Sequence, residues 1–289
     1  MKKERPASKR KIVKAILFFV GLMICSYPLV SSIVEQRHLK DAIATYQKQI
    51  EDCDEIDMKT AMSQAEEYNS VLYQSEGKNI NTPFGEILRS ENYNSLLNLT
   101  GNGIVGSVEI PKISVNLPIY HGTDEEVLTI GIGHVEGTSL PVGGENTRTV
   151  LAGHRGLPNS KLFTRLDELE TGDFFFIKVL DEVLAYEVVD IEVIEPEDIS
   201  KLEIVPEKDL ATLLTCTPYG LNTHRLIVTG ERAAYDEIEY QSIKKEMMSF
   251  RELFFAVMPF VFAVIGIGTV IRNRKSKKIK LKRRGARRL

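Results

Sequence analysis

Cysteine is scarce in this sequence of 289 residues. Its three cysteines are too few and too widely spaced for the disulfide framework of a small secreted protein. No two cysteines have C-x-x-C spacing and no two histidines have H-x₃-H spacing, although zinc sites usually show such pairs. The sequence therefore predicts no metal site, and a ligand set built from Cys216 and His224 with His121 or His134 is disfavoured.

Signatures of several common enzyme classes are also missing. The chain has no Gly-rich phosphate-binding loop and no serine in a G-x-S-x-G motif. It has no internal repeat, and low-complexity sequence is confined to the basic C-terminal tail. With 43% hydrophobic residues, the chain is neither intrinsically disordered nor fibrous.

The chain as a whole is nearly neutral, but its ends are strongly basic and its middle is acidic. The 37 basic and 40 acidic side chains give a net charge of −3. Residues 1–14 contain seven Lys or Arg and one acid, and residues 272–289 contain eleven Lys or Arg and no acid. The 19 basic and 39 acidic residues between them leave a charge of about −20. Two basic ends thus enclose a long acidic body.

An apolar run lies just inside each basic end. Residues 15–34 and residues 253–271 contain no charged side chain, and each run is close to the roughly 20 residues that a helix needs to cross a bilayer. We expect two flanking transmembrane helices. Pro28 interrupts the first run and leaves a cleaved signal peptide as its alternative. A buried core helix is the alternative for the second run.

The charged ends predict how the chain is oriented. Positive residues beside a membrane span stay on the cytoplasmic side, so we expect residues 1–14 and 272–289 in the cytoplasm and residues 35–252 outside it. The protein is then a cell-membrane protein with the lipid bilayer as a partner. A basic tail can also indicate a nucleic-acid binder, but we interpret this one as a topology determinant attracted to anionic lipid. No nucleic-acid partner is predicted.

Residues 35–100 are predicted to form a helical arm and a lid. Apolar residues at steps of three and four predict helix over residues 35–75. These positions are Leu39, Ile43, Tyr46, Ile50, Ala61, Ala65, Tyr68, Val71 and Leu72. Between the two patterns, Cys53 has acidic neighbours that disfavour a thiolate, and we interpret it as inert. Beyond residue 77, Thr82, Pro83 and Phe84 form a predicted turn.

Residues 101–240 are predicted to form a β-barrel. Short segments rich in Val, Ile, Thr and aromatic residues are separated by Gly, Pro and Asn, which is typical of a mostly β fold. The candidate strands are Ile104–Ile110, Val115–Tyr120, Arg148–Ala152, Asp173–Leu180, Leu184–Ile194, Ala211–Cys216 and Arg225–Gly230. We expect a barrel of seven or eight strands, with a hairpin around Asp181 and Glu182.

One cysteine is placed to react. Cys25 lies in the first apolar run, whereas Cys216 ends the strand-like segment TLLTC and precedes a turn at Pro218. A thiol at the end of a strand is accessible yet held by the sheet, which suits a nucleophile. An unreactive buried cysteine is the alternative, because free cysteine usually behaves as a small apolar residue.

A cysteine nucleophile needs a proton carrier and a group that stabilises an oxyanion. His154 is the candidate carrier, because it lies in the segment AGHRG, where a strand meets a glycine-flanked loop. Arg225 begins the strand after Cys216, and a tight turn over residues 218–222 would bring the two side chains to one rim. A guanidinium could hold a carbonyl or an oxyanion. An exposed strand arginine paired with an acid is the alternative.

These residues stand in motifs that resemble those of the sortases, the cysteine transpeptidases of Gram-positive cell surfaces. The motifs are TLLTC ending at Cys216, AGHRG around His154 and NTHRL around Arg225, with IPKI, LPIYHGT and GHVEGTSLPVGG upstream. The likeness covers most of residues 95–235 and is stronger for class C, the pilus-assembling branch. A second membrane span after the barrel also fits class C. The resemblance implies a sortase-like barrel that works without a cofactor or metal.

The resemblance also implies a role for each position. Cys216 would attack the carbonyl between Thr and Gly of an LPXTG-like sorting signal, and His154 would protonate the leaving amine. Arg225 would bind the carbonyl or oxyanion, with Thr215 and Asn222 contacting the substrate. A pilin Lys amine would then resolve the thioacyl enzyme, so the implied partners are pilin subunits that carry the signal and an acceptor Lys.

Two other functions remain open at this point. A sortase could instead attach surface proteins to a peptidoglycan amine, using the same three residues with a different nucleophile. Outside the enzymes, the barrel could be a non-catalytic surface scaffold, which would make the three residues incidental.

The candidate lid departs from the class pattern. Class C sortases typically carry a lid with an Asp-Pro-aromatic tip in the active site, and the nearest segment here is Thr82-Pro83-Phe84. A threonine cannot form an ion pair with the arginine of the site. We therefore expect a looser or differently anchored lid in which Phe84 covers Cys216, and an ordinary loop that never reaches the site is the alternative.

Overall fold

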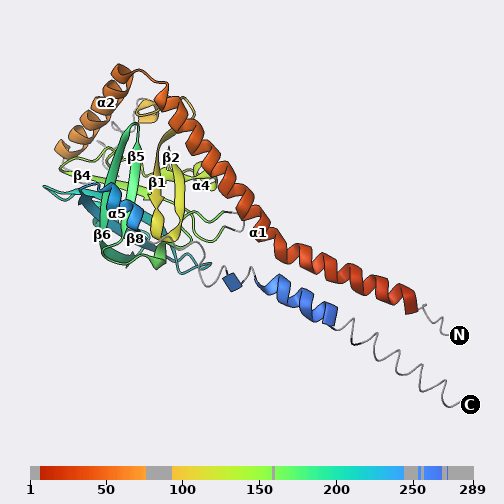
Figure 1. Cartoon of the computed structure of the whole chain (residues 1–289). Coiled ribbons are helices and arrows are strands. Elements are labelled where there is room, and N and C mark those ends of the chain that lie inside the picture. Colours follow the sequence, from red (N-terminus) through yellow and green to blue (C-terminus); the bar gives the residue numbers. More distant parts are fainter. Residues whose placement is uncertain are drawn as a thin grey trace, which may run out of the picture. The chain divides into compact units, whose positions relative to one another are not determined.

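The structure is a computed structural model, drawn in Figure 1. It describes residues 7–75, 93–157, 160–243, 253–254, 257–268 and 272. The chain divides into two compact units. One consists of Met1–Ile33 with Met248–Leu289, and the other is Val34–Met247.

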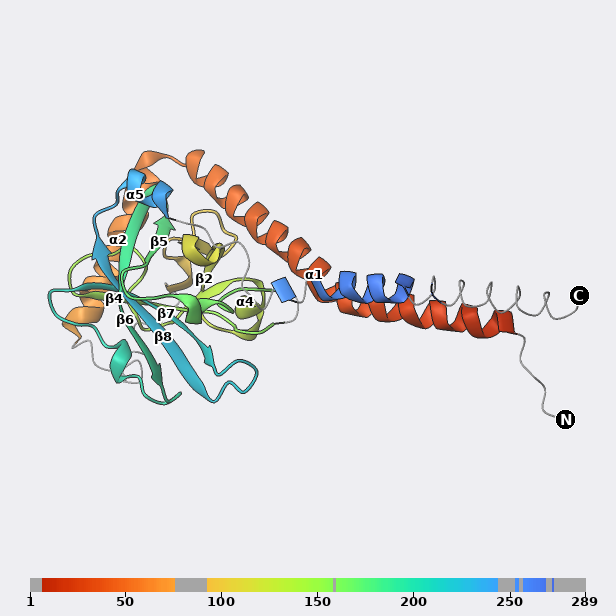
Figure 2. The same ribbon diagram turned by 60° about the horizontal axis from the view of Figure 1, so that its bottom comes forward.

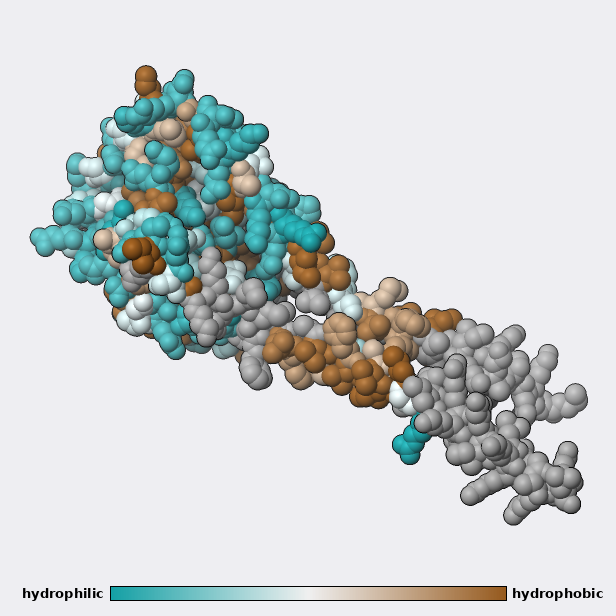
Figure 3. Space-filling model, in the orientation of Figure 1, coloured by the Kyte–Doolittle hydropathy of each residue, from teal (hydrophilic) through white to brown (hydrophobic). Residues whose placement is uncertain are grey.

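The first unit is helical where it is described. Helix α1 (Ala7–Glu51) begins in this unit and continues through Pro28 without a break. A second helical stretch covers residues 257–268, and there Gly266 lies close to the ring of Phe18. Apolar side chains are exposed along both stretches, and Figure 3 shows them as hydrophobic surface.

The two apolar runs were predicted to cross a membrane. Among the residues that the structure describes, no helix combines the length and the apolar character that a membrane span requires. The flanking transmembrane helices predicted at residues 15–34 and 253–271 therefore lack support from the structure. Residues 255–256 and 269–271 of the second run lie outside the described residues.

The predicted helical arm consists of the later part of α1 and of helix α2 (Glu55–Gln74). The helices are separated next to Cys53, whose thiol donates a hydrogen bond to the Gln49 carbonyl oxygen at 3.2 Å. Of the apolar positions predicted for the arm, Val71 is exposed. The others are buried: Leu39, Ile43, Tyr46, Ile50, Ala61, Ala65, Tyr68 and Leu72. Each helix thus buries one apolar stripe, as its sequence periodicity predicts.

Polar contacts fix the position of the arm on the barrel. The buried Asn69 amide donates to the Leu140 carbonyl oxygen at 3.1 Å and accepts from the Leu140 N–H at 2.7 Å. The Tyr46 hydroxyl donates to the Val105 carbonyl oxygen at 3.3 Å and accepts from the Leu180 N–H at 3.4 Å. A buried polar group without a partner costs free energy, so these bonds favour one position of the arm over others.

Eight strands close the barrel in the order β1-β2-β3-β4-β7-β8-β6-β5 (Figure 1). They are β1 (Ile104–Ile110), β2 (Val115–His121), β3 (Ile132–His134), β4 (Thr147–Ala152), β5 (Phe174–Val179), β6 (Glu182–Ile194), β7 (Asp209–Thr217) and β8 (His224–Ala233). The mostly β fold with seven or eight strands is confirmed. Seven of the strands overlap the predicted segments, and β3 is the addition.

Strand β3 escapes prediction because it is short and contains glycine. It pairs in parallel with β2 and antiparallel with β4. A Cβ atom on Gly133 would lie only 2.2 Å from the Gly122 carbonyl oxygen, so the close approach of the two backbones requires glycine. Glycine has low β-propensity, and the strand is held by its neighbours.

The other pairings place the strands that matter for the site. Strands β5 and β6 form the hairpin predicted around Asp181. Strand β7 is antiparallel to β8 and parallel to β4. The remaining short helical elements are η1 (Tyr93–Ser95), η2 (Pro111–Ile113), α4 (Glu125–Ile130), η3 (Leu166–Glu168), η4 (Ser200–Leu202) and α5 (Glu237–Ser242).

One apolar core joins the arm and the barrel, since a single buried cluster contains residues of α1, α2 and most strands. Inside the barrel, the rings of Phe175 and Tyr186 stack with centroids 5.5 Å apart. Gly230 lies beside them, where a Cβ atom would come within 2.6 Å of the Phe175 ring. The interior is therefore filled by side chains.

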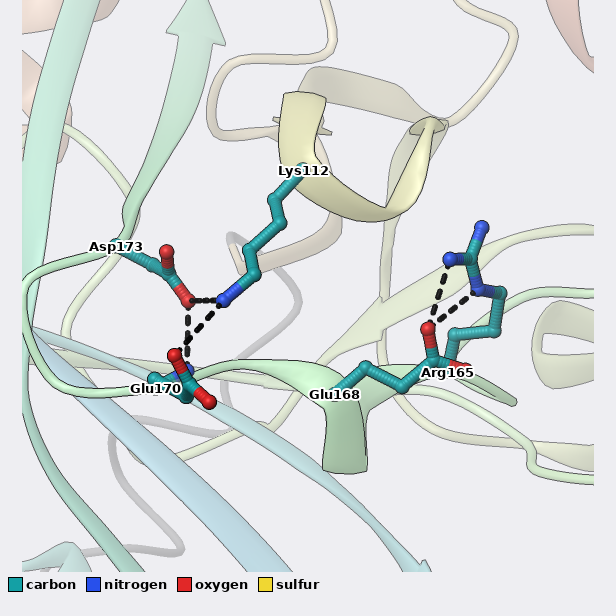
Figure 4. A network of polar contacts seen from close by, with 5 residues as sticks. All are labelled: Lys112, Arg165, Glu168, Glu170 and Asp173. Atoms are coloured by element: carbon teal, nitrogen blue, oxygen red, sulfur yellow. Dashed lines mark hydrogen bonds and ion pairs between the residues drawn. The ribbon is translucent and has the colours of Figure 1, made fainter. Parts of the chain in front are cut away.

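The ion pairs of Lys112 connect the segment before β5 to the turn between β1 and β2. Figure 4 shows Lys112 of η2 next to Asp173 at 2.8 Å and Glu170 at 3.4 Å. In the same figure, Arg165 meets Glu168 of η3 at 2.7 Å. The side chains of Lys112, Asp173, Arg165 and Glu168 are at most one-quarter exposed, so these pairs are screened less than surface pairs.

Candidate active site

Strands β7 and β8 bring two of the candidate residues together. They lie side by side in Figure 2, joined by residues 218–223. Their antiparallel register sets Cys216 directly opposite Arg225. In the loop, the Pro218 carbonyl oxygen accepts from the N–H groups of Leu221 and Asn222 at 3.1 and 3.0 Å. The tight turn predicted from the sequence is confirmed, and the two residues stand opposite each other at the same end of the two strands.

His154 reaches the same end of the barrel from β4. The parallel pairing of β4 with β7 ends at Ala152 and Leu214, and the Gly153 N–H continues it by donating to the Leu214 carbonyl oxygen at 3.0 Å. His154 follows at once and lies beside the end of β7. Because β7 stands between β4 and β8 in the sheet, the thiol of Cys216 is flanked by the histidine on one side and the arginine strand on the other.

The surroundings of the three residues differ. Cys216 is partly buried. The His154 side chain is 26% exposed, and its Nε2 atom lies 3.7 Å from the Glu125 carboxylate and has no hydrogen-bond partner among the described residues. The Arg225 Nη1 donates to the carbonyl oxygens of His224 at 3.1 Å and Asn222 at 3.4 Å. The contacts described for Arg225 are thus with backbone carbonyls, unlike the acid pairing considered from the sequence.

Three residues near this site were not recognised from the sequence. Arg155 donates from Nη1 to the Thr217 hydroxyl at 2.9 Å, and its Nη2 lies 2.5 Å from the Asp167 carboxylate. Thr217 directly follows Cys216. The only signal was the position of Arg155 next to His154 in the AGHRG segment. Nothing in the sequence pointed to Asp167, which is distant along the chain.

The two predicted substrate-contacting residues occupy different environments. Thr215 is 1% exposed, and its hydroxyl donates to the Gly153 carbonyl oxygen at 2.7 Å. Asn222 is exposed in the β7–β8 loop, in a left-handed backbone conformation with φ of 57°. The Thr215 hydroxyl thus donates its hydrogen bond to the protein's own backbone. Substrate contact by either residue stays a prediction.

The predicted lid cannot be placed in this arrangement. Thr82, Pro83 and Phe84 lie outside the described residues, so the covering of Cys216 by Phe84 stays a prediction.

The histidines considered as alternative metal ligands belong to the core. Nδ1 of His134 is 2.7 Å from the Tyr93 hydroxyl, and its Nε2 is 2.9 Å from the Ser139 carbonyl oxygen. The His121 ring meets Tyr93 edge-on, with centroids 4.8 Å apart. Burial lowers the pKa of both histidines to about 4. Among the described residues, no group of three or more His, Cys, Asp or Glu side chains is arranged to hold a metal ion.

An apolar strip leads away from Cys216 on the outer face of the sheet. The strip consists of Val150, Ile194, Leu202 and Ile227, with Val135 and Leu214 packed against them. Leu214 is two residues before Cys216, and Ile227 is two residues after Arg225. Alternate residues of a strand share a face, so the strip and the reacting groups lie on the same side of the sheet. Leu202 of η4 covers part of it.

The geometry combines what acyl transfer needs. A thiol, an imidazole and a guanidinium are carried at the same end of three neighbouring strands, and such groups can serve as nucleophile, proton carrier and hydrogen-bond donor. The apolar strip beside them consists largely of buried side chains and supports the strands that carry these groups. None of these groups depends on a metal or a cofactor to act.

Comparison with known proteins points to one family. A family model described as a sortase domain matches residues 108–233. Among solved structures, sortase C1 of Streptococcus agalactiae is 45% identical, with a TM-score of 0.63, and the match covers 68% of this chain and 100% of that chain. The match with sortase C of Streptococcus pneumoniae has 42% identity and a TM-score of 0.61, over 68% of this chain and 97% of that one.

A third solved structure is sortase C of Clostridium perfringens with a C-terminal cell wall sorting motif. It is 41% identical, with a TM-score of 0.58, over 68% of this chain and 99% of that chain. The structural neighbours are thus class C sortases. Two curated relatives, sortase D of Bacillus subtilis and sortase A of Streptococcus agalactiae, are 36% and 29% identical, and the chain spans 63% and 61% of their length.

Proposed function

Because this chain belongs to the sortase family, whose members are cysteine transpeptidases, we propose that it joins pilin subunits by acyl transfer. It cleaves an LPXTG-like sorting signal between Thr and Gly and passes the acyl group to a pilin Lys amine. The observation that carries this proposal is the pairing of Cys216 with Arg225 across β7 and β8, with His154 beside them.

The reaction proceeds in two balanced steps. In the first, the Cys216 thiolate attacks the Thr carbonyl carbon, the C–N bond to Gly breaks, and protonated His154 gives its proton to the leaving amine. In the second, the incoming amine attacks the thioester, His154 takes its proton, and the thiolate leaves. Arg225 donates hydrogen bonds to the carbonyl oxygen, which carries negative charge in both tetrahedral intermediates.

The outer-face strip supports an apolar segment at the start of the substrate motif. A peptide whose Thr carbonyl lies at Cys216 would extend its preceding Leu and Pro toward Leu214 and Val135, the partly exposed members of the strip. Burial of a leucine-sized side chain is worth about 1.5–3 kcal/mol, enough to orient the scissile bond.

The choice of a pilin acceptor rests on the structural neighbours. The sortase C of Streptococcus pneumoniae is described in terms of pilin substrate specificity, and that of Clostridium perfringens was solved with a cell wall sorting motif. Carried over to this chain, these two properties favour a pilin that bears the sorting signal, and the proposal adds a Lys of a second pilin as the acceptor. Attachment to a peptidoglycan amine is the competing outcome of the test below.

The proposed location is the cell membrane, with residues 35–252 outside the cytoplasm and both termini inside. Its support is the distribution of charge and apolar residues along the chain. A pilin reaches the site only on the outer side of the membrane, so location and substrate agree.

The test uses the full-length chain, a peptide carrying Leu-Pro-Glu-Thr-Gly, and a candidate pilin. We expect a thioacyl adduct on Cys216 by mass spectrometry and a Lys-linked product with the pilin. Cys216→Ala should abolish both. Cys53→Ala is the matched control, because Cys53 lies in the turn of the helical arm, and it should react at the wild-type rate.

Two results would overturn the proposal. A Cys216→Ala protein that still formed pilin ladders would exclude acyl transfer through this thiol. A wild-type protein that transferred the acyl group to a peptidoglycan-type amine, but not to pilin Lys, would replace the pilin acceptor by the peptidoglycan one.

A further inference from the structure

The register between β4 and β7 continues beyond their last backbone pair. In the ladder, each residue of β4 pairs with the residue 62 positions later, ending with Ala152 and Leu214. The Thr215 hydroxyl then donates to the Gly153 carbonyl oxygen at 2.7 Å, again joining residues 62 apart. A side chain thus takes over the role of the backbone ladder where the strand pairing stops.

A second cross-link follows with the same spacing. Nη1 of Arg155 donates to the Thr217 hydroxyl at 2.9 Å, and these two residues are also 62 positions apart. His154 and Cys216 lie between the two cross-links and are also 62 positions apart. The proton carrier and the nucleophile are therefore enclosed by one hydrogen bond on each side.

Arg155 is well suited to hold such a cross-link. Its side chain is 4% exposed, and its other terminal nitrogen lies 2.5 Å from the Asp167 carboxylate. Burial of a guanidinium is costly unless the charge is paired, and Asp167 supplies that partner. The bond to Thr217 is thus not needed to neutralise the arginine, but it sets the spacing between the His154 loop and the end of β7.

Other bonds hold the same loop from a different direction. The Phe163 N–H donates to the His154 carbonyl oxygen at 3.1 Å, and the Gly156 N–H donates to the Thr164 hydroxyl at 3.2 Å. These bonds attach the loop to the segment before η3. They do not join it to β7, to which the loop is attached by the Gly153 N–H bond to the Leu214 carbonyl oxygen and by the two side-chain cross-links.

We propose that Arg155 is a positioning residue which, through the Thr217 hydroxyl, keeps His154 in register with Cys216. The inference rests on the acyl-transfer function proposed above. A proton carrier must lie within hydrogen-bond reach of the groups that it serves, and a misplacement of about 1 Å can cost roughly 100-fold in rate. The effect falls on kcat rather than on substrate binding, because neither side chain extends into the apolar strip.

The first test changes only the hydroxyl of Thr217. Acyl transfer by the full-length protein is measured with the Leu-Pro-Glu-Thr-Gly peptide and an amine acceptor. Thr217→Val, which keeps the shape and removes the acceptor, should lower kcat by roughly 10-fold with KM unchanged. Thr217→Ser, which keeps the hydroxyl, should retain the wild-type kcat. If Thr217 only stabilised the fold, the two variants would have the same kcat whenever their thermal stabilities are equal.

The second test changes the arginine and uses a matched control. Arg165 is equally buried, with a side chain 4% exposed, and pairs with Glu168 in the same η3 turn. Arg155→Lys and Arg165→Lys should lose similar thermal stability. Arg155→Lys should also lose roughly 10- to 100-fold in kcat, whereas Arg165→Lys should keep the wild-type value. The double variant with Arg155→Lys and Thr217→Val should be no slower than Arg155→Lys alone, because the two changes remove the same hydrogen bond.

The outcomes separate this inference from the function on which it rests. If wild type forms no thioacyl adduct on Cys216, both proposals fall. If wild type reacts but Thr217→Val is as fast as Thr217→Ser, or Arg155→Lys as fast as Arg165→Lys, only the positioning role is overturned.

Discussion

Cys216 of β7 and Arg225 of β8 are direct partners in an antiparallel pair. Side chains of such partners project from the same face, with Cβ atoms about 4.5–5.5 Å apart. On its other side, Arg225 is paired with Ile194 of β6. The sheet thus places Arg225 between Cys216 and Ile194, a residue of the apolar strip.

This pairing predicts a large effect of Arg225 on the rate. Arg225→Gln should lower kcat/KM of peptide cleavage by about 100- to 1,000-fold, because a donor to the developing oxyanion is lost. Arg232→Gln is the control on the same strand, since Arg232 lies at the other end of β8, 3.7 Å from Asp209. Its kcat/KM should remain close to wild type. Equal losses in the two variants would exclude a specific role for Arg225.

A small effect is expected for Glu125. Its carboxylate is 3.7 Å from His154, but its side chain is 84% exposed, and exposed ion pairs contribute only about 0–1 kcal/mol. Glu125→Gln should therefore change kcat by less than about fivefold. Steady-state kinetics at low and high salt would check this, and a loss of tenfold or more would assign the carboxylate a larger role.

Acid should destabilise the protein through its buried histidines. Burial lowers the pKa of His134 from 6.5 to about 4, so the unfolded chain binds more protons than the folded one between these values. Stability is therefore lost as the pH falls from about 6.5 toward about 4. Between about pH 7 and pH 5, this side chain alone should lower the free energy of unfolding by about 2 kcal/mol. The lowered pKa of His121 acts with the same sign.

Urea unfolding of two variants at both pH values would check this expectation. His134→Gln should be less stable than wild type near neutral pH, because the Tyr93 hydroxyl loses a partner, but its stability should depend less on pH. His38→Gln changes an exposed histidine on α1 and should keep the wild-type pH dependence. An unchanged pH dependence in His134→Gln would contradict the assignment.

The arm should contribute to stability through Asn69. Asn69→Ala leaves the Leu140 N–H and carbonyl without their buried partners, which should cost about 2–4 kcal/mol in the free energy of unfolding. Asn69→Asp should also destabilise, because a carboxylate oxygen would face the Leu140 carbonyl. Ser70→Ala, at the next and exposed position of α2, should change stability by less than about 0.5 kcal/mol. Similar unfolding midpoints for Asn69→Ala and Ser70→Ala would show that the arm is not fastened there.

The sequence predicted best what depends on short separations. Cys216 and Arg225 are nine residues apart across a turn with Pro218, so their strands were recognisable and their meeting followed from the turn. The hairpin at Asp181 was predicted for the same reason. The buried stripes of the arm followed from helical periodicity alone, with Val71 as the exception.

Pairings between distant segments were harder to predict. Strand β3 is three residues long and is held in place by its pairing with β2 and β4. His154 was identified by its motif and its resemblance to a family, not by any spacing that placed it near Cys216. The substrate contacts assigned to Thr215 followed the same resemblance, whereas the structure shows its hydroxyl bonded to Gly153.

The sequence by itself determined the class of fold, the one cysteine at a strand end and the arginine across the turn from it. Only the tertiary structure decided that Arg155, Thr217 and Asp167 surround the histidine loop. The physical reason is that β4 and β7 are parallel and separated by 62 positions. Parallel strands meet through a long crossover rather than a turn, so their register leaves no local signal and appears only when the barrel closes.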